Sequence, residues 1–286
     1  MLADLAMVRA AHIILASASP RRSAILNEQL QLGVRAIPSA FAEDLDKASY
    51  SPQEYVRETA RQKALDVFAT CEKPFMSKHE RPPSLVIGAD TVVILGDQIL
   101  EKPTSVDHAC HASSRSPALP PRPRALLTMR ASEPRRCRRR MLRELSDAGT
   151  HTVCTGVSLI YGGGAPGGQP HEHSFSEETI VTFRPLDEDE IEAYVASGEP
   201  MDKAGAYGIQ GLGGVFVSGV VGDYQNVVGF PVSRFYKELD TARLAEWVDN
   251  APAEEAAPVV DDPCDPLAPI ISDECLDEDE CGLPSD

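Results

Sequence analysis

Short runs of apolar and β-branched residues alternate along this chain with segments of helical periodicity, and this alternation restricts the possible folds more than any other feature. Residues 13–16 form the first apolar run, and Ser19 and Pro20 after it suit the N-cap and first position of a helix. Ser51 opens a second helix through an S-x-x-E capping box with Glu54. Strands that alternate with helices are typical of α/β proteins, so we expect a mixed sheet flanked by helices.

The same periodicities predict where the other elements lie. Gly96 and Asp97 form a turn signal between two β-rich segments, which indicates a buried strand that continues into a hairpin. We expect strands at residues 13–16, 85–89, 91–95, 98–100, 152–161, 179–183 and 214–217. We expect helices at residues 20–30, 52–69, 186–196 and 232–247.

Composition indicates a protein with one sizeable core, or two small ones, and no membrane partner. The 286 residues are 42% hydrophobic and 25% charged. No apolar run is long enough to span a bilayer, and residues 1–11 lack the apolar block of a secretory signal, so we expect a cytoplasmic protein. Seven cysteines form no CxxC pair or zinc-like array, so we expect reduced thiols. We take residues 1–11 as an N-terminal extension and residues 12–248 as the domain.

The acidity of the chain belongs mostly to residues 249–286. This segment carries thirteen Asp and Glu residues and no Lys or Arg, and without those charges the net charge of −17 becomes −4. Its Pro, Ala and acidic composition offers little apolar surface to bury, so we expect a disordered tail. A passive, solubilising extension and a partner-binding tail both fit that composition.

Residues 110–138 interrupt a sequence that otherwise reads smoothly, because the segments before and after them would join as a loop and an amphipathic helix. We interpret this Pro- and Arg-rich segment as an insertion, either a long surface loop or untranslated sequence read through in the gene. The basic cluster at residues 135–140 is a pattern found in RNA-binding and nuclear-import segments. No aromatic residue lies near it to stack on bases, so we expect no nucleic-acid partner.

Two segments carry the first candidate site residues. Ser17-Ala18-Ser19-Pro20-Arg21-Arg22 stands at a strand-to-helix turn, where free backbone N–H groups and two guanidiniums would suit phosphate oxygens. An ordinary capped helix with solvated arginines is the alternative. Asp90 follows the apolar run Leu85-Val86-Ile87. A carboxylate at a buried strand end is costly unless it meets a cation or hydrogen-bond donors, so Asp90 is a candidate metal ligand or general base. A structural Asp in a turn is the alternative there.

Further candidates lie in lysines and glycine-rich segments. Lys63 and Lys102 would suit phosphate as point charges, although most such lysines are only solvated. Glycines are interleaved with Asp, Lys, Tyr and Gln in residues 198–211 and 222–231. A flexible loop does not require so many polar side chains, so these segments are candidate ligand-binding loops. A purely structural loop is the alternative.

Six of these motifs together resemble one family. ILASASPRR, ETARQKA, VIGADTVV, ILEKP, GEPMDKAGAYGIQG and GDYQNVVGFP stand in the order found in Maf-type nucleotide pyrophosphatases, and the likeness covers residues 12 to about 239 apart from the insertion. It extends to the Maf-like domain that some animal proteins carry fused to a methyltransferase-like domain. The resemblance implies a Maf/inosine-triphosphatase-like α/β fold, a mixed twisted sheet flanked by helices with two lobes around a cleft.

The resemblance also implies roles for individual residues. Asp90 matches the general base and, with Glu43, the acids that hold Mg²⁺ or Mn²⁺; a one-residue slip in alignment would replace Glu43 by Asp44. Lys63 and Lys102 match catalytic, phosphate-binding lysines. The expected substrate-binding residues are Ser17, Ser19, Arg21, Arg22, Thr91, Asp202, Lys203 and Gln210, of which Arg21, Thr91 and Gln210 match positions that select the base.

The implied activity is hydrolysis of dTTP or UTP to the monophosphate and pyrophosphate, a house-cleaning nucleoside triphosphate diphosphatase reaction. The form GAYGIQG resembles the dTTP/UTP branch of the family more than the branch acting on methylated GTP. A nucleotide-binding regulator of cell division without turnover is the competing interpretation, because the insertion begins near Lys102. The resemblance also suggests a homodimer.

Overall fold

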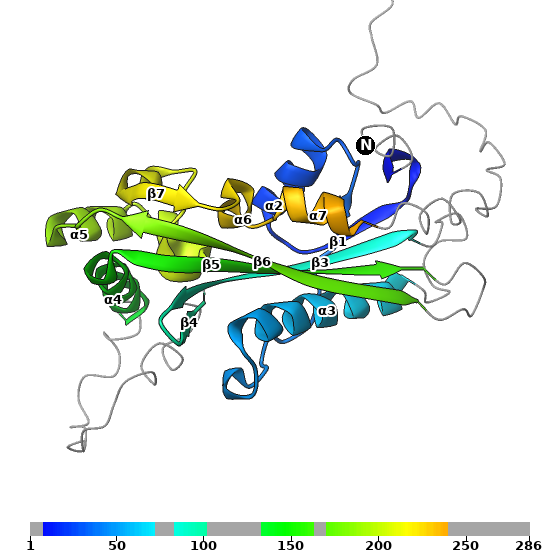
Figure 1. The fold of residues 1–286 in the computed structure, drawn as a ribbon, viewed down its shortest axis with the longest axis horizontal. Coiled ribbons are helices and arrows are strands. Elements are labelled where there is room, and N and C mark those ends of the chain that lie inside the picture. Colours follow the sequence, from blue (N-terminus) through cyan, green and yellow to red (C-terminus); the bar gives the residue numbers. More distant parts are fainter. Residues whose placement is uncertain (1–7, 72–82, 102–132, 163–169, 240–286) are drawn as a thin grey trace, which may run out of the picture. The chain divides into compact units, whose positions relative to one another are not determined.

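The computed structural model describes residues 8–71, 83–101, 133–162 and 170–239 (Figure 1). Several expectations lie outside these residues: Lys102, residues 110–132 of the expected insertion, residues 240–247 of the last predicted helix and the acidic tail. Within the described part of the chain, no helix has the length and apolar character needed to cross a membrane.

A seven-stranded mixed sheet forms the centre of the fold, as the alternating pattern predicts. Its strands are β1 (Ile13–Ala16), β2 (Arg35–Ala36), β3 (Leu85–Leu95), β4 (Gln98–Leu100), β5 (Thr150–Tyr161), β6 (His171–Phe183) and β7 (Val217–Val221). The order is β2-β1-β3-β5-β6-β7, with β4 paired to β3. β1 runs parallel to β2 and β3, whereas the pairs β3–β5, β5–β6 and β6–β7 are antiparallel.

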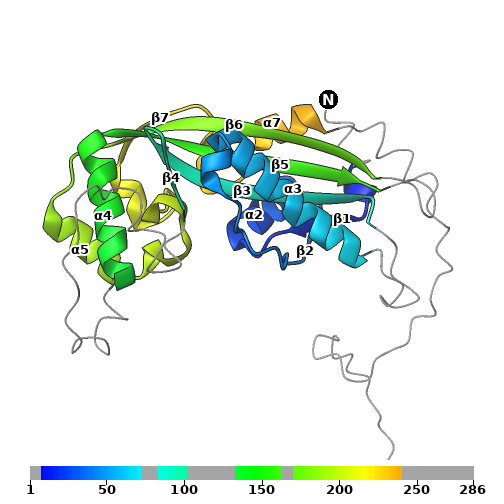
Figure 2. The ribbon, with the colours of Figure 1, turned by 90° about the horizontal axis from the view of Figure 1, so that it is seen from below.

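Helices cover both faces of this sheet. They are α2 (Pro20–Ala24), which continues as a π-helix over Ile25–Gln29, α3 (Pro52–Cys71), α4 (Glu133–Ala148), α5 (Glu188–Ala196), α6 (Tyr224–Val228) and α7 (Val232–Glu238). Figure 1 shows α3 on one face and α2, α6 and α7 on the other, and Figure 2 shows α3 running across β3 and β5. The predicted capping box is present, since the Ser51 backbone N–H donates to Glu54 Oε2 (2.9 Å) and the Glu54 N–H donates to Ser51 Oγ (3.3 Å).

Two glycines bring α3 unusually close to the sheet. A Cβ on Gly88 of β3 would lie 2.0 Å from the Ala60 carbonyl oxygen, and one on Gly156 of β5 would lie 2.3 Å from the Val56 carbonyl. Real Cβ atoms do not approach backbone so closely, so only glycine allows this packing. The close approach places Lys63, one turn beyond Ala60, over β3.

Four expectations about elements were wrong. Residues 85–95 form one continuous strand, so Asp90 lies in its middle and not at a strand end; Lys63 compensates its charge there. Residues 212–216 form a 3₁₀ helix where we expected a strand, because Gly213 and Gly214 allow tight turns, and β7 follows it. β6 begins at His171, eight residues earlier than expected, because its first four residues are all polar and exposed or half-buried, so they carry no alternating apolar signal. Helix α4 begins at Glu133, inside the segment interpreted as inserted.

The basic cluster at residues 135–140 lies on α4, which packs against α5. Arg139 pairs with Glu192 of α5, and Arg140 pairs with Glu144 one turn along (2.7 Å). Neighbouring acids thus neutralise part of the cluster.

Buried side chains form two main hydrophobic clusters. The first lies under α2, α6 and α7 and also includes Val8 and Ala11, so these two residues of the expected N-terminal extension are part of the core. The second joins α4 and α5 to β5 and β6. The cavity described next is lined by Val228 from the first cluster and by Val153 and Tyr207 from the second, so it lies where the two meet.

Candidate active site

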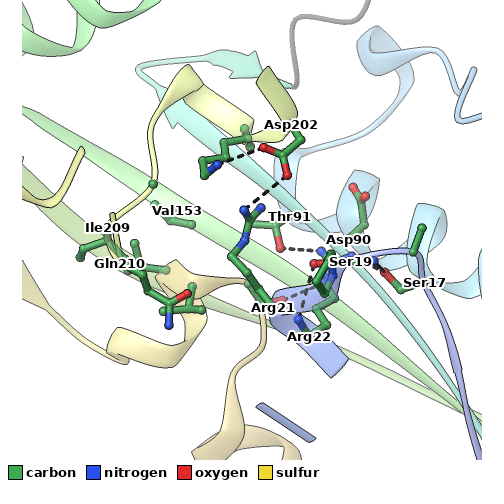
Figure 3. Close-up of a pocket in the computed structure, with 18 of the residues that line it drawn as sticks. Ser17, Ser19, Arg21, Arg22, Asp90, Thr91, Val153, Asp202, Ile209 and Gln210 are labelled. Carbon is green, nitrogen blue, oxygen red and sulfur yellow. Dashed lines mark hydrogen bonds and ion pairs between the residues drawn. The ribbon is translucent and has the colours of Figure 1, made fainter. Parts of the chain in front are cut away.

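A cavity of ≈ 600 Å³ gathers the predicted site residues (Figure 3). Every predicted site residue that the structure describes lines it: Ser17, Ser19, Arg21, Arg22, Glu43, Lys63, Asp90, Thr91, Asp202, Lys203 and Gln210. They come from the β1–α2 turn, the loop before α3, α3 itself, β3 and the glycine-rich loop. A cavity of this volume is within the ordinary range for a small-molecule site.

Lys63 joins the two acidic candidates at one end of the cavity. Its Nζ lies 2.8 Å from Asp90 Oδ1 and 2.9 Å from Glu43 Oε1. The side chains of Lys63 and Asp90 are only 8% and 12% exposed, whereas that of Glu43 is 49% exposed. A buried ammonium and a buried carboxylate are tolerated because each compensates the other. The arrangement leaves Glu43 open to the cavity and fixes Asp90 in place.

The loop that carries Glu43 is held by a residue that sequence reasoning missed. Asp66, on α3, accepts hydrogen bonds through Oδ2 from Ser39 Oγ and from the Ala40 backbone N–H, both at 2.7 Å. Glu43 itself has a φ of 54°, in the left-handed region that non-glycine residues rarely adopt. Local strain at Glu43 and the anchor at Asp66 together direct this acid toward Lys63.

The two neighbouring arginines of the β1–α2 turn are used differently. Arg22 is buried, and it donates from Nε to the Gly229 carbonyl (2.9 Å), from Nη1 to the Ala89 carbonyl (2.9 Å) and Ser17 Oγ (3.2 Å), and from Nη2 to Thr91 Oγ1 (2.8 Å). Burial lowers the pKa of Arg22, and the nearby Asp90 opposes that effect. Four of the five guanidinium hydrogens are therefore used inside the protein, which leaves one for a ligand.

Arg21 faces the cavity instead. Its side chain is 30% exposed, and Nη1 lies 3.6 Å from Asp202 Oδ2. Lys203 Nζ lies 3.0 Å from the other oxygen of Asp202 and also donates to the Glu199 carbonyl oxygen (2.6 Å). An exposed ion pair at 3.6 Å is weak, so Arg21 is available to an anionic ligand.

A buried polar network continues from Arg22 to residues that carried no sequence signal. Thr91 Oγ1 and Thr155 Oγ1 share a hydrogen bond (3.0 Å), and Thr155 donates to the Asn226 carbonyl oxygen (3.3 Å). Asn226, fully buried on α6, donates to the Val153 carbonyl oxygen (3.0 Å). The network connects α6 and β5 to the floor of the cavity. Asn226 belongs to the motif GDYQNVVGFP, but nothing in the sequence of that motif indicates that its side chain is buried in this network.

Lys102 lies outside the described residues, but its neighbour Glu101 is anchored beside the site. Tyr55 donates to Glu101 Oε1 (2.5 Å), and Lys47 Nζ lies 2.7 Å from Glu101 Oε2. The pKa of Tyr55 is raised by burial, by the Glu101 hydrogen bond and by the charges of Glu101 and Asp90, so its hydroxyl remains a donor. This contact fixes the end of β4.

The acids fit a divalent cation only together with a ligand's oxygens. Among the described residues, no three His, Cys, Asp or Glu side chains gather closely enough to hold a metal ion. Mg²⁺ is commonly bound by one or two carboxylates plus phosphate oxygens of a substrate. Glu43 and Asp90 supply such a pair, so the residues present fit Mg²⁺ or Mn²⁺ accompanied by a polyphosphate.

The fold and the cavity together define an α/β protein whose cleft is lined by cationic Lys and Arg side chains and by a pair of carboxylates. The model of the family described as Maf-like protein matches residues 12–115 and 129–242, and the chain belongs to this family. The unmatched residues 116–128 fall inside the segment 110–138 that the sequence marked as inserted.

Curated relatives carry consistent names. The chain is 42% identical over 233 residues to a human protein named probable bifunctional dTTP/UTP pyrophosphatase/methyltransferase protein; the match covers 79% of this chain and 31% of the human one. It is 40% identical to the dTTP/UTP pyrophosphatase of Thermococcus kodakarensis, covering 79% of this chain and 94% of the relative. It is 36% identical to that of Schizosaccharomyces pombe, covering 83% and 86%. The chain thus spans about a third of the human relative and nearly all of the archaeal one.

Proposed function

We propose that this protein hydrolyses dTTP and UTP to the nucleoside monophosphate and pyrophosphate. The observation that carries the proposal is the Glu43–Lys63–Asp90 centre in one cavity with the partly exposed Arg21 and with Gln210. The names of relatives that are 35–42% identical to this chain support the same reaction.

In this proposal Asp90 is the general base. A water oxygen forms a bond with the α-phosphorus, the water proton passes to Asp90, and the bond to the bridging oxygen breaks as pyrophosphate leaves. Lys63 and Arg21 stabilise the charge that develops on the phosphate oxygens. Glu43 and Asp90 would hold Mg²⁺ or Mn²⁺, which supplies further neutralisation of the polyphosphate when bound.

Base selection is assigned to the other end of the cavity. Figure 3 shows Ile209 and Gln210 at one end, Asp90 and Ser17 at the other, and Arg21 between them. An amide supplies both an acceptor and a donor, so Gln210 suits the N3–H and 4-oxo groups of uracil or thymine. Cytosine presents an acceptor at N3 and a donor at its 4-amino group, so an amide oriented for uracil or thymine would leave both of its hydrogen-bonding atoms unpaired.

The test measures pyrophosphate release from dTTP, UTP, CTP, ATP, GTP and a methylated GTP, with and without Mg²⁺ or Mn²⁺. We expect Asp90→Asn to lose about 10² to 10⁴ of the rate, because the amide keeps the volume and loses the base. Asp97→Asn, in the exposed β3–β4 turn of the same hairpin, is the matched control and keeps full activity. Nucleotide binding without turnover in the unmodified protein would instead establish the non-catalytic regulator.

Gln210→Ala tests the base assignment. Loss of the pairing group should lower the dTTP/CTP ratio of kcat/KM by about 1–3 kcal/mol in free energy, which is about 5- to 150-fold. The phosphate contacts are untouched, so CTP turnover persists. An unchanged ratio would mean that base recognition lies elsewhere in the cavity.

A further inference from the structure

Glu199 lies against the loop that carries Gln210 and is bonded to one end of it. Its Oε1 accepts hydrogen bonds from Tyr194 Oη (3.0 Å) and from the Gly213 backbone N–H (3.1 Å), and its Oε2 accepts one from the Leu212 N–H (2.8 Å). A single carboxylate therefore holds two successive backbone groups that follow Gln210.

Tyr194 holds the other end of the same loop. Its hydroxyl oxygen accepts a hydrogen bond from the Gly208 backbone N–H (3.1 Å) while its proton goes to Glu199. The loop from Gly208 to Gly213 is thus closed by two side chains that bond to each other, one from α5 and one from the turn after it. Gln210 stands between the two anchored ends.

The side chains beneath this loop leave little room for a Cβ at its glycines. A Cβ on Gly208 would lie 2.6 Å from Lys203 Cε, and one on Gly211 would lie 2.6 Å from the Glu199 carboxyl group. A Cβ on Gly213 would lie 2.6 Å from Tyr194 Oη. The loop backbone therefore packs directly against the side chains that hold it, and its glycines allow this close contact rather than provide flexibility.

Charge favours this arrangement at neutral pH. Burial acts to raise the pKa of Glu199, but hydrogen bonds from Gly213, Leu212 and Tyr194 and the charge of Lys203 outweigh it, so the pKa lies below its usual value. Burial raises the pKa of Tyr194, which keeps its hydroxyl protonated as a donor. An ionised acceptor facing three donors makes stronger hydrogen bonds than a neutral one would.

We infer that Glu199 and Tyr194 are positioning residues for base selectivity: they fix the loop from Gly208 to Gly213 so that Gln210 meets the base in one orientation. The inference rests on the proposed function. Gln210 itself is exposed, so the direction of its amide depends on the backbone that carries it. A recognition group held in its binding geometry discriminates better than a mobile one, because ordering costs less on binding.

The experiment compares Glu199→Gln with Glu190→Gln. Glu190, on the same helix as Tyr194, also accepts three hydrogen bonds, two from Arg184 and one from the Asp187 N–H, but it lies outside the cavity lining. In Glu199→Gln one amide N–H₂ must face a donor, so at least one anchor is lost. We expect its dTTP/CTP ratio of kcat/KM to fall by about tenfold, as for a charged hydrogen bond, while Glu190→Gln keeps the ratio of the unmodified protein.

Hydrogen exchange gives a second readout that does not depend on turnover. The amides of Gly208, Leu212 and Gly213 should exchange faster in Glu199→Gln and at the original rate in Glu190→Gln. Should Glu199→Gln fail to fold, Tyr194→Phe replaces it, since it removes the bond to Glu199 and the acceptor for Gly208 while keeping the ring. The same fall in the ratio is expected.

The outcomes separate this inference from the proposed function. Absence of pyrophosphate release from dTTP in the unmodified protein refutes the proposed function. If the protein is selective and Gln210→Ala removes the selectivity, an unchanged ratio in Glu199→Gln or Tyr194→Phe overturns the inference alone. If Gln210→Ala leaves the ratio intact, the inference falls with the base assignment while the hydrolytic reaction stands.

Discussion

The contact between α3 and the sheet can be tested by adding one methyl group at Gly88. The new Cβ would lie 2.0 Å from the Ala60 carbonyl oxygen and 2.9 Å from Ala64 Cβ, so α3 must move away by about 1 Å to restore an ordinary contact. Overpacking of this kind costs about 1–3 kcal/mol and sometimes more. Backbone resists the shift more than a side-chain tip would, so we place Gly88→Ala at the upper end of that range.

The same shift should also reach the chemistry. Lys63 lies on α3 between Ala60 and Ala64, and its Nζ is 2.8 Å from Asp90 Oδ1. A displacement of about 1 Å at a catalytic group can cost on the order of 10²-fold in rate. We therefore expect Gly88→Ala to lower both Tm, by about 2–4 °C per kcal/mol, and kcat for dTTP.

Gly219→Ala is the matched control for this substitution. Gly219 lies on β7, and a Cβ there would be 3.7 Å from Thr182 Cβ, an ordinary contact. Thermal unfolding and pyrophosphate release are measured for both variants. If Gly88→Ala and Gly219→Ala unfold at the same temperature with equal turnover, the close packing of α3 does not position Lys63 and the reasoning is refuted.

Two further predictions concern buried groups. Arg22→Lys should destabilise the protein by about 2–4 kcal/mol, because an ammonium cannot reproduce the four hydrogen bonds that Arg22 makes in fixed directions. Arg21→Lys should mainly raise KM. Measurements of Tm and KM for the two variants test this difference. His151 is buried beside Tyr207, and burial lowers its pKa to about 4. The folded protein then binds fewer protons than the unfolded chain between about pH 6.5 and 4, so His151 makes stability fall by up to about 3 kcal/mol as pH decreases through that window. Tm against pH for His151→Gln should lack this part of the slope, and an unaltered slope would contradict the assignment.

Sequence periodicity predicted the elements whose start is marked by local chemistry. The Ser19 cap and the Ser51 box fixed the starts of α2 and α3, because caps depend on residues only a few positions apart. The expected strand at residues 214–217 is wrong for residues 214–216, since β-branched residues favour strands, whereas the 3₁₀ turn depends on a hydrogen bond from Gly213 to Glu199, which lies outside the turn.

For the site, the sequence predicted which residue types gather in the cavity but not the direction in which each side chain points. Arg21 and Arg22 are adjacent and chemically identical, yet successive helical residues point about 100° apart, so one faces the cavity and the other enters the protein. Which of the two turns inward depends on the carbonyl groups of Ala89 and Gly229, 67 and 207 residues away in sequence. The same holds for Glu199, whose partners are backbone N–H groups that any residue provides. A motif can therefore indicate which chemistry gathers in a cleft, but whether a charged group acts on a ligand or braces the wall follows only from the donors and acceptors around it.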